Sequence, residues 1–264
     1  DTLLAAKATN TALALKAPIA APVFTGNVGV GVTPESAWHS SLTALQLGGN
    51  ASLSAQTTQG SSKQAYFSQN IYNDGDQKYI STDEASEYRQ QNGTHTFRVA
   101  PSGSADAAIN WTTAMIIDNA GIVRKTYQPA FSANAVDTSN VPINTFQTVN
   151  LTEIFDNNAD FNPSTDAFTA PVGGKYQLNG SIRIDSLSHA SAYMYIRITT
   201  SNRGYYSIVS PPAFDSTPQY WGLTISHLAD MDAGDTATLS FYIGGGTVGA
   251  DIHSESIFSG YLAC

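Results

Sequence analysis

Side chains with catalytic chemistry are few in this sequence, and their spacing does not bring them together. Histidine precedes serine at His39 and His253, but neighbours in an extended chain point to opposite faces. The Gly-x-Ser-x-Gly turn that exposes a hydrolase serine does not occur. The acidic pair Asp83-Glu84 has groups suited to glycoside cleavage, yet such pairs are usually only solvated. We therefore expect a protein that is not an enzyme.

Metal ligands are also sparse. None of the five histidines lies four residues from another, and the single cysteine is Cys264. The sequence therefore lacks the spacing of histidine and cysteine ligands that is typical of zinc sites. Calcium prefers oxygen ligands, and Asp215, Asp230 and Asp232 are the candidates for supplying them. Asp235 is better interpreted as a turn residue that hydrogen-bonds its own backbone. We expect no cofactor, with calcium as the alternative.

Two predicted loops mix aromatic with polar side chains, which favours binding over catalysis. Rings stack on apolar surfaces of a ligand, while amides and guanidinium groups form hydrogen bonds. Loops on a rigid scaffold commonly carry recognition. The candidate receptor-binding residues are Asn202, Arg203, Tyr205, Tyr206, Phe214, Tyr220, Trp221 and His253. Phe214 and Trp221 have an alternative interpretation as core residues at strand ends.

The composition is typical of a β-rich extracellular or virion protein. Charged residues make up only 12% of the 264 residues, while the surface can still be polar through Ser, Thr and Asn. A formal net charge of -9 argues against a nucleic-acid partner. No run approaches the roughly 18 apolar residues of a membrane span, so we expect no membrane insertion. Cys264 cannot form an internal disulfide and is either a free thiol or a contact between chains.

The N-terminal residues 1–16 are rich in Ala and Leu. Leu4, Ala8, Thr11 and Leu15 follow a heptad seam, which predicts the end of a coiled coil. Because so short a helix is marginal in water, we expect it to continue a longer one. An ordinary amphipathic helix is the alternative.

Residues 17–26 predict an extended linker, because their prolines would prevent the helix from continuing. Residues 27–125 predict a β-rich neck module. Its strongest signals are the Asn-Asp-Gly-Asp turn at 73–76, a strand at 94–99 and a hairpin at 115–123.

Residues 126–264 predict a separate domain with longer strands. Its clearest strand contains Tyr176, Leu178, Ile182 and Ile184 on one face, with polar residues between them. A second strand, at 192–199, alternates in the same way, and a third is expected at 145–151.

Three motifs in this last region occur in the order found in one known family. They are Asp-Ala-Phe-Thr-Ala-Pro-Val-Gly-Gly-Lys-Tyr-Gln-Leu at 166–178, Gly-Asp at 234–235 and Phe-Ser-Gly-Tyr-Leu at 258–262. They resemble the signatures of complement first-component-q (C1q) globular heads and their relatives with the tumour-necrosis-factor (TNF) fold. Asp166 stands near the family's glycine and Leu178 replaces its last aromatic residue. The resemblance implies a trimeric jelly-roll sandwich of ten strands.

Two other motifs resemble bacteriophage tail fibres. Residues 17–26, Ala-Pro-Ile-Ala-Ala-Pro-Val-Phe-Thr-Gly, are similar to a linker between fibre modules, and residues 115–123 are similar to fibre neck modules. The resemblance implies a virion protein of the phage tail that attaches to a host cell-surface glycan or protein. Because the chain begins at Asp1 rather than Met, we expect a missing N-terminal part that binds other tail or baseplate proteins.

A homotrimer would explain the heptads, the linker and the head together, since all three would share one axis. The candidate trimer-interface residues are Leu4, Thr11, Leu15, Phe24, Tyr193, Tyr195, Tyr242 and Tyr261. The tyrosines have an alternative interpretation as solvent-side or core residues of one chain.

Two further functional interpretations differ in class. A secreted lectin with a complement-type head, from a cellular organism, would be compatible with the Asn-x-Ser/Thr sites at Asn50, Asn92, Asn110, Asn150 and Asn179. Such sites also arise by chance in a chain of this composition, and the collagen repeat and disulfides of that class are missing. A depolymerase spike would need a long repetitive β-helix, and no such period is visible.

Overall fold

The structure is a computed structural model that describes residues 24–246 and 249–264. The predicted coiled coil of residues 1–16, with Leu4, Thr11 and Leu15, and most of the linker lie outside the described residues. The described chain is mainly β, as predicted, and divides into two compact units on either side of the Thr126–Tyr127 bond. Its helical element is the short 3-10 turn η1 (Pro211–Ala213), and no described helix has the length and apolar character needed to cross a membrane.

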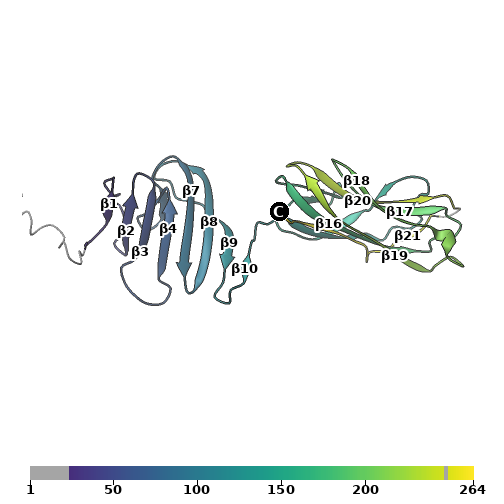
Figure 1. Cartoon of the computed structure of the whole chain (residues 1–264), viewed down its shortest axis with the longest axis horizontal. Helices are drawn as coiled ribbons and strands as arrows, with labels where there is room; N and C mark the ends of the chain where they lie inside the picture. The colour runs from purple at the N-terminus through teal and green to yellow at the C-terminus, as the bar shows by residue number, and fades with distance from the viewer. Residues whose placement is uncertain (1–23, 247–248) are drawn as a thin grey trace, which may run out of the picture. The chain divides into compact units, whose positions relative to one another are not determined.

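Unit 1 is built on one eight-stranded sheet (Figure 1). The sheet order is β1-β2-β3-β4-β7-β8-β9-β10, and every pair is antiparallel except β1 with β2. The strands of unit 1 are β1 (Val28–Val30), β2 (Leu42–Leu47), β3 (Ala51–Gln56), β4 (Gln64–Gln69), β5 (Ile71–Asn73), β6 (Gln77–Tyr79), β7 (Asp83–Gln91), β8 (Thr94–Gly103), β9 (Thr112–Ile117) and β10 (Val123–Arg124). The predicted turn at 73–76 joins β5 to β6, and the predicted hairpin at 115–123 is β9 with β10.

The β5–β6 hairpin and neighbouring loops cover one face of this sheet. Two small apolar clusters lie beneath them, one around Trp38 and Tyr72 and the other around Ile71, Tyr79 and Ile109. The Tyr72 hydroxyl donates to Asp106 Oδ1 at 2.8 Å, so the buried phenol has a partner. These clusters are small for a sheet of eight strands.

The covered face of the sheet carries a row of polar side chains. In register across five strands the row reads Gln46, Ser52, Ser68, Glu87 and Arg98. Glu87 accepts from Arg98 Nε at 3.0 Å, and Arg98 and Trp111 Nε1 both donate to Gln77 Oε1 at 2.8 Å. Burying such groups is tolerated only when they are paired, and the β6 glutamine completes the network.

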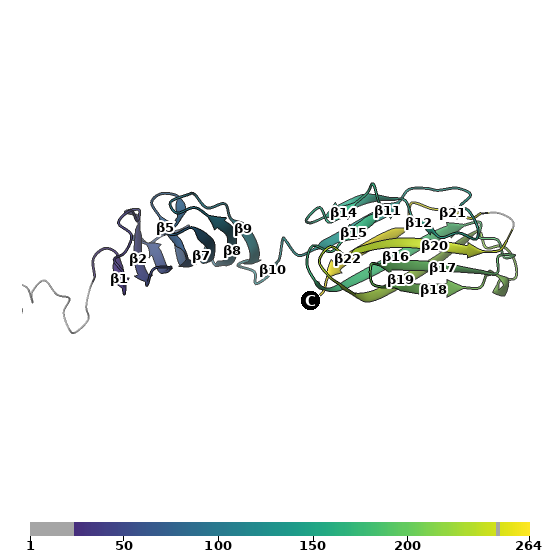
Figure 2. The same ribbon diagram turned by 90° about the horizontal axis from the view of Figure 1, so that it is seen from above.

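Unit 2 is a sandwich of two sheets (Figure 2). The β16 sheet has the order β13-β11-β22-β16-β19 with β21 added to β16, and the β17 sheet has the order β14-β15-β20-β17-β18 with β12 added to β20. The strands are β11 (Ala130–Ala135), β12 (Gln147–Thr148), β13 (Leu151–Asp156), β14 (Phe161–Asn162), β15 (Ala167–Thr169), β16 (Gly174–Asp185), β17 (Tyr193–Thr200), β18 (Gly204–Val209), β19 (Tyr220–Met231), β20 (Thr236–Gly244), β21 (Asp251–Ile252) and β22 (Ile257–Leu262).

The sandwich therefore has twelve strands, two more than the ten expected of a jelly roll, and three of them, β12, β14 and β21, contain only two residues each. The strand expected at 145–151 is not continuous. The chain leaves the β17 sheet after β12 and enters the β16 sheet at β13, so the predicted strand is divided between the two sheets.

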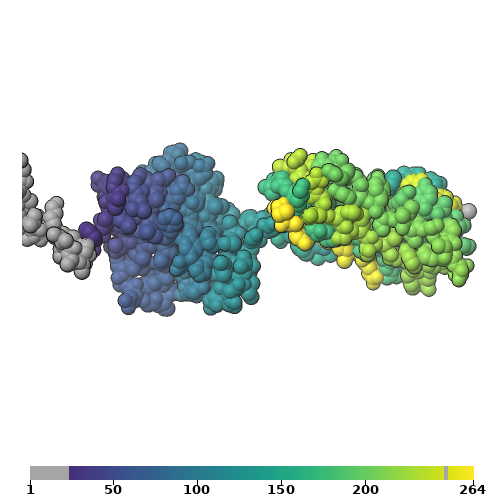
Figure 3. All heavy atoms as spheres, viewed as in Figure 1, coloured from purple at the N-terminus to yellow at the C-terminus, as the bar shows by residue number. Residues whose placement is uncertain are grey.

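The core of unit 2 lies between the two sheets. Along β16, Tyr176, Leu178, Ile182 and Ile184 are buried, which confirms the predicted alternation. Phe131 stacks on Phe168 with ring centroids 4.6 Å apart. Such close packing between two rigid sheets gives a stable support for groups on their outer faces. The last residues of the chain, in yellow, lie at the surface of unit 2, where Cys264 is exposed (Figure 3).

Candidate binding site

The outward-facing side chains of β17 begin the strongest candidate site. Met194, Ile196 and Ile198 point into the core and are fully buried, so Tyr193, Tyr195 and Arg197 must point outward. This is the alternation that the sequence predicts.

Neighbouring strands add more rings to the same surface. Tyr195 is directly opposite Tyr242 on β20, and Arg197 is opposite Tyr206 on β18. Phe146 precedes β12 and reaches the same face, with its ring 5.0 Å from that of Tyr242. We call this surface the outer aromatic patch, formed by Phe146, Tyr193, Tyr195, Arg197, Tyr206 and Tyr242.

The rings of the patch hold one another in place. Tyr193 lies 5.2 Å from Tyr195 and 5.8 Å from Tyr242, the latter nearly parallel at 13°. Tyr195 meets Tyr206 edge-on at 5.9 Å. The hydrogen bond with the neighbouring Tyr193 hydroxyl, together with desolvation, raises the pKa of Tyr242. A mutually packed set of rings loses little conformational freedom when a ligand binds.

Arg197 is the one charged group of the patch. Its guanidinium lies 3.7 Å from the centroid of Phe146, and Nε donates to Ser240 Oγ at 3.1 Å. It forms no ion pair with a carboxylate of the described residues. A positioned cation beside partly exposed rings can bind a carboxylate or sulfate while the rings stack on an apolar ligand face.

The domain that carries the patch has a recognisable family. A model of the C1q domain matches residues 130–263, which is half of the chain. The chain belongs to the C1q domain family. C1q and TNF-like domains are generally non-enzymatic binding modules and commonly form homotrimers.

Solved structures similar to this chain include the globular domain of zebrafish complement 1qA protein, at 20% identity and a TM-score of 0.39. That likeness covers 52% of this chain and 98% of the other. Murine APRIL at pH 8.0 is similar at 11% identity and a TM-score of 0.39, over 51% of this chain and 98% of the other. No curated protein matches the chain.

The C1q signature departs from the family at a position that the structure explains. Asp166, which replaces a glycine, has a φ of 53°, a left-handed conformation that aspartate tolerates better than most residues. Its Oδ1 accepts the Leu151 N–H at 2.7 Å. Burial raises the pKa of Asp166, and that hydrogen bond opposes the shift. The side chain thus supports the conformation that glycine would adopt freely.

The predicted receptor-binding residues of this C1q domain do not gather at one tip. Asn202 and Arg203, in the β17–β18 turn, lie at the end of β19 that contains Asp230, whereas Tyr220 and Trp221 begin β19 at its other end. Tyr205 faces the core side and stacks on His227 at 4.7 Å, while Tyr206 joins the outer aromatic patch.

The end of β19 that contains Tyr220 has a polar cluster of its own. The Arg183 guanidinium lies 4.7 Å from the Tyr220 ring and pairs with Asp185 at 3.0 Å and Glu255 at 2.6 Å. The hydrogen bond from Arg183 lowers the pKa of Glu255. A hollow of about 320 Å³ lies there, lined by Arg183, Tyr220, Trp221 and Gly222. Because Asp185 and Glu255 already bind the Arg183 guanidinium, this group is less available to a ligand than the guanidinium of Arg197.

The other residues predicted near this end are structural. Phe214 and Trp221 pack together at 4.5 Å on the margin of the core, in agreement with their alternative interpretation. The His253 N–H donates to the Arg183 carbonyl at 3.1 Å, and its ring accepts the Glu255 N–H.

The three aspartates considered for calcium do not form a ligand cluster. Asp230 pairs with Arg203 at 2.9 Å, and Asp232 donates its N–H to Asp235 Oδ2 at 2.9 Å. Asp215 lies after η1, apart from both. Within residues 24–246 and 249–264, no group of three or more acidic, histidine or cysteine side chains could hold a metal.

The tyrosines proposed for a trimer interface occupy two different faces. Tyr193, Tyr195 and Tyr242 belong to the outer aromatic patch of the β17 sheet. Tyr261 lies on the outer face of the β16 sheet, in register with Leu228 through Gln177. Other exposed apolar side chains of this second face are Phe155 and Ile257.

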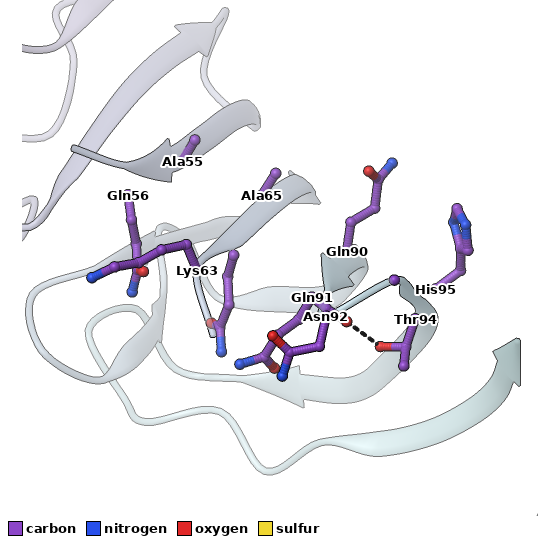
Figure 4. A pocket seen from close by; sticks show the side chains of 11 residues that line it. Ala55, Gln56, Lys63, Ala65, Gln90, Gln91, Asn92, Thr94 and His95 are labelled. Carbon is purple, nitrogen blue, oxygen red and sulfur yellow. Dashed lines mark hydrogen bonds between the residues drawn. The ribbon is translucent and has the colours of Figure 1, made fainter. Parts of the chain in front are cut away.

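A hollow of about 370 Å³ occurs in unit 1, and Figure 4 shows its side chains. Amides of Gln56, Gln91 and Asn92 line it, and Thr94 Oγ1 donates to the Gln91 carbonyl at 2.7 Å. His95 contributes the one ring among the lining residues. This hollow offers hydrogen bonds without the aromatic platform of unit 2, so we do not choose it as the principal site.

Sequence reasoning missed Phe146 and Arg197 in the patch. Arg197 alternates with the buried residues of β17 in the same way as Tyr193 and Tyr195. The alternation alone was therefore sufficient to predict that Arg197 lies on the same outer face. Phe146 gave no such signal, because the strand after it has only two residues and its partner, β20, comes about a hundred residues later.

Proposed function

We propose that the chain is the ligand-binding end of a homotrimeric adhesion protein, and that the ligand is an acidic cell-surface glycan. The observation that carries the proposal is Arg197, a cation without a carboxylate partner among the described residues, set among half-buried tyrosines and the exposed Tyr206. Rings stack on the apolar faces of sugars, and a guanidinium binds a carboxylate or sulfate through two hydrogen bonds.

The setting we propose is a bacteriophage tail fibre that attaches to its host. The tail-fibre resemblance of residues 17–26 and 115–123 supports this setting, and the C1q domain supports the role of a binding head. Three heads on one fibre would bind a repeating glycan at several points, so weak single sites would sum to firm attachment.

The contact between heads is assigned to the outer face of the β16 sheet. Phe155, Leu228, Ile257 and Tyr261 are exposed there without partners in one chain. Large exposed apolar patches usually mark contacts between proteins. This assignment leaves the outer aromatic patch free on each copy, so Tyr193, Tyr195 and Tyr242 serve the ligand rather than the interface.

Binding to immobilised host polysaccharide tests the proposal. Arg197→Ala should weaken binding by about 10- to 100-fold, because truncating an anchor commonly costs about 1.5–3 kcal/mol. Arg203→Ala is the matched control, since Arg203 is also on the β17 sheet side of the domain but pairs with Asp230. Removing the acidic groups from the polysaccharide should abolish the difference between wild type and Arg197→Ala.

Equal binding by wild type and Arg197→Ala would refute the patch as the site. Loss of binding in Arg203→Ala alone would move the site to the β17–β18 turn.

A secreted lectin of a cellular organism is the second candidate, favoured by the C1q domain itself and by the Asn-x-Ser/Thr sites. Asn50 and Asn92 lie in exposed turns of unit 1, where an oligosaccharide transferase could reach them. Intact mass measured on protein from its native source separates the two. Attached glycan supports the lectin, whereas the bare sequence mass supports the fibre.

A further inference from the structure

The uncovered face of the unit 1 sheet is apolar along its whole width. A single register row crosses seven strands, from β1 to β9, and contains only apolar or aromatic side chains. In strand order the row reads Val28, Leu45, Leu53, Phe67, Tyr88, Phe97 and Met115. Phe67, at its centre, is 52% exposed, and Leu53 is 46% exposed. We call the face that carries this row the open face.

The rows on either side complete the open face. One contains Val30, Leu47, Ala51, Gln69, Ser86 and Val99, and the other contains Thr43, Ala55, Ala65, Gln90, His95 and Ile117. None of these side chains is acidic, lysine or arginine. Gln90 and His95 of the second row belong to the margin seen in Figure 4. An apolar centre with a polar, uncharged margin is the anatomy of a protein interface.

Polar and apolar side chains are distributed over the two faces of this sheet in the opposite way from an ordinary sheet with one face in water. The side covered by the β5–β6 hairpin carries Ser52, Ser68 and Glu87, whereas the side without a cover carries leucines and phenylalanines. An antiparallel sheet normally buries its apolar face and leaves its polar face in water. Folding of one chain alone therefore leaves the more apolar face of this sheet unburied.

The open face is large enough for a stable association. Seven strands spaced by about 4.8 Å span about 34 Å, and six residues along each strand span about 20 Å, which gives about 700 Å² in projection. Each partner in a standard stable interface contributes about 800 Å². The face is therefore comparable with one side of a specific complex.

We propose that the open face binds the open face of other copies of this chain, so that unit 1 is a second, independent oligomerisation module. An uncharged apolar face complements another uncharged face, and a second copy supplies one of the same size. The C1q domain on the same chain is of a kind that commonly forms homotrimers, which raises the local concentration of unit 1 copies.

Phe24 extends the same surface. It is 62% exposed and lines a hollow of about 640 Å³ together with Val28, Leu45 and Leu53. A ring from a neighbouring copy would fill this hollow, which agrees with the expectation that Phe24 packs near a shared axis.

Site-directed cysteines in the full chain test the proposal. In a Cys264→Ser background, Phe67→Cys reports on the open face, and Leu228→Cys reports separately on the proposed contact between heads. Ile122→Cys is the control, because Ile122 is 58% exposed in the β9–β10 turn, away from the row. Leu53→Cys provides a second open-face probe if Phe67→Cys folds poorly.

The expected result has two parts. A short bismaleimide should join Phe67→Cys chains to each other but should not join Ile122→Cys chains. Alkylation of Phe67→Cys should be at least about tenfold slower than that of Ile122→Cys, because an interface closed nine-tenths of the time protects it to that extent. This pattern supports the proposal whether or not Leu228→Cys also crosslinks.

Rapid alkylation of Phe67→Cys without crosslinks would overturn the proposal, even if Leu228→Cys shows that the heads associate. Protection of Phe67→Cys without a link between chains would also overturn it, since the cover would then be another segment of the same chain. Crosslinking at Phe67→Cys with none at Leu228→Cys would keep the proposal and refute the assigned head interface.

Discussion

Unit 1 and unit 2 both consist almost entirely of β-strands, but they differ in which faces of their sheets they bury. Unit 2 places its apolar side chains between two sheets, where residues such as Phe131, Phe168 and Leu178 are fully buried. Unit 1 buries a polar network around Glu87 beneath a hairpin and leaves Leu53 and Phe67 open. The difference teaches that strand alternation defines two faces without determining which of them a single chain covers.

The comparison also separates two sources of stability. The core of unit 2 is one continuous cluster, so the domain can be stable as a single chain. The clusters of unit 1 are two small groups around Tyr72 and Tyr79. We expect unit 1 to depend on association between copies for much of its stability.

The largest effect is expected from the core of unit 2. Phe168→Ala removes a fully buried ring that stacks on Phe131 at 4.6 Å and approaches Tyr176 at 5.4 Å. The free energy of unfolding of unit 2 should fall by about 3–5 kcal/mol, because transfer and cavity contributions add. Denaturant unfolding of the full chain, followed by two probes, measures it. A loss below about 1 kcal/mol would show that the two sheets do not pack as described.

A somewhat smaller effect is expected from the polar network of unit 1. Glu87→Ala leaves the Arg98 guanidinium buried without its carboxylate, which should lower stability by about 3 kcal/mol. Glu87→Leu combined with Arg98→Met should recover most of the loss, since no buried charge remains. Thermal unfolding of both variants measures the difference. Equal loss in the single and double variants would mean that the network does not act as a pair.

The smallest effect is a dependence of unit 1 on alkaline pH. Burial and the hydrogen bond to Asp106 raise the pKa of Tyr72 from 10.0 to about 12. The neutral phenol is the form that the fold favours, so its contribution is complete below pH 10.0 and is lost as the pH rises through about 12. Tyr72→Phe should unfold with a weaker pH dependence in that window. Unchanged dependence would place the alkaline transition in other groups.

Much of unit 2 was predictable from local pattern. The alternation of Tyr176, Leu178, Ile182 and Ile184 predicted the inward face of β16, and the three motifs of residues 166–262 predicted a C1q-type sandwich. The two-residue strands β12, β14 and β21 were not predictable, because a pairing of two residues leaves no periodic signal.

The sites were less predictable than the strands. Tyr193, Tyr195 and Tyr242 were singled out from their positions along the chain, but their grouping with Phe146 depends on which strands are neighbours. Arg203 and Tyr220 come from the two predicted recognition loops, and the structure places these loops at opposite ends of β19. The open face was not predicted from the sequence, because no single strand reveals it. Its apolar row can be recognised only when the register across seven strands is known.

Molar mass in solution tests the association of copies most directly. Light scattering on a sizing column, at falling protein concentration, compares the full chain with its sequence mass of 27.9 kDa. We predict a species of three times that mass that persists on dilution, because two faces on each chain hold the copies together. A chain of 27.9 kDa at all concentrations would contradict both the proposed head contact and the association of open faces.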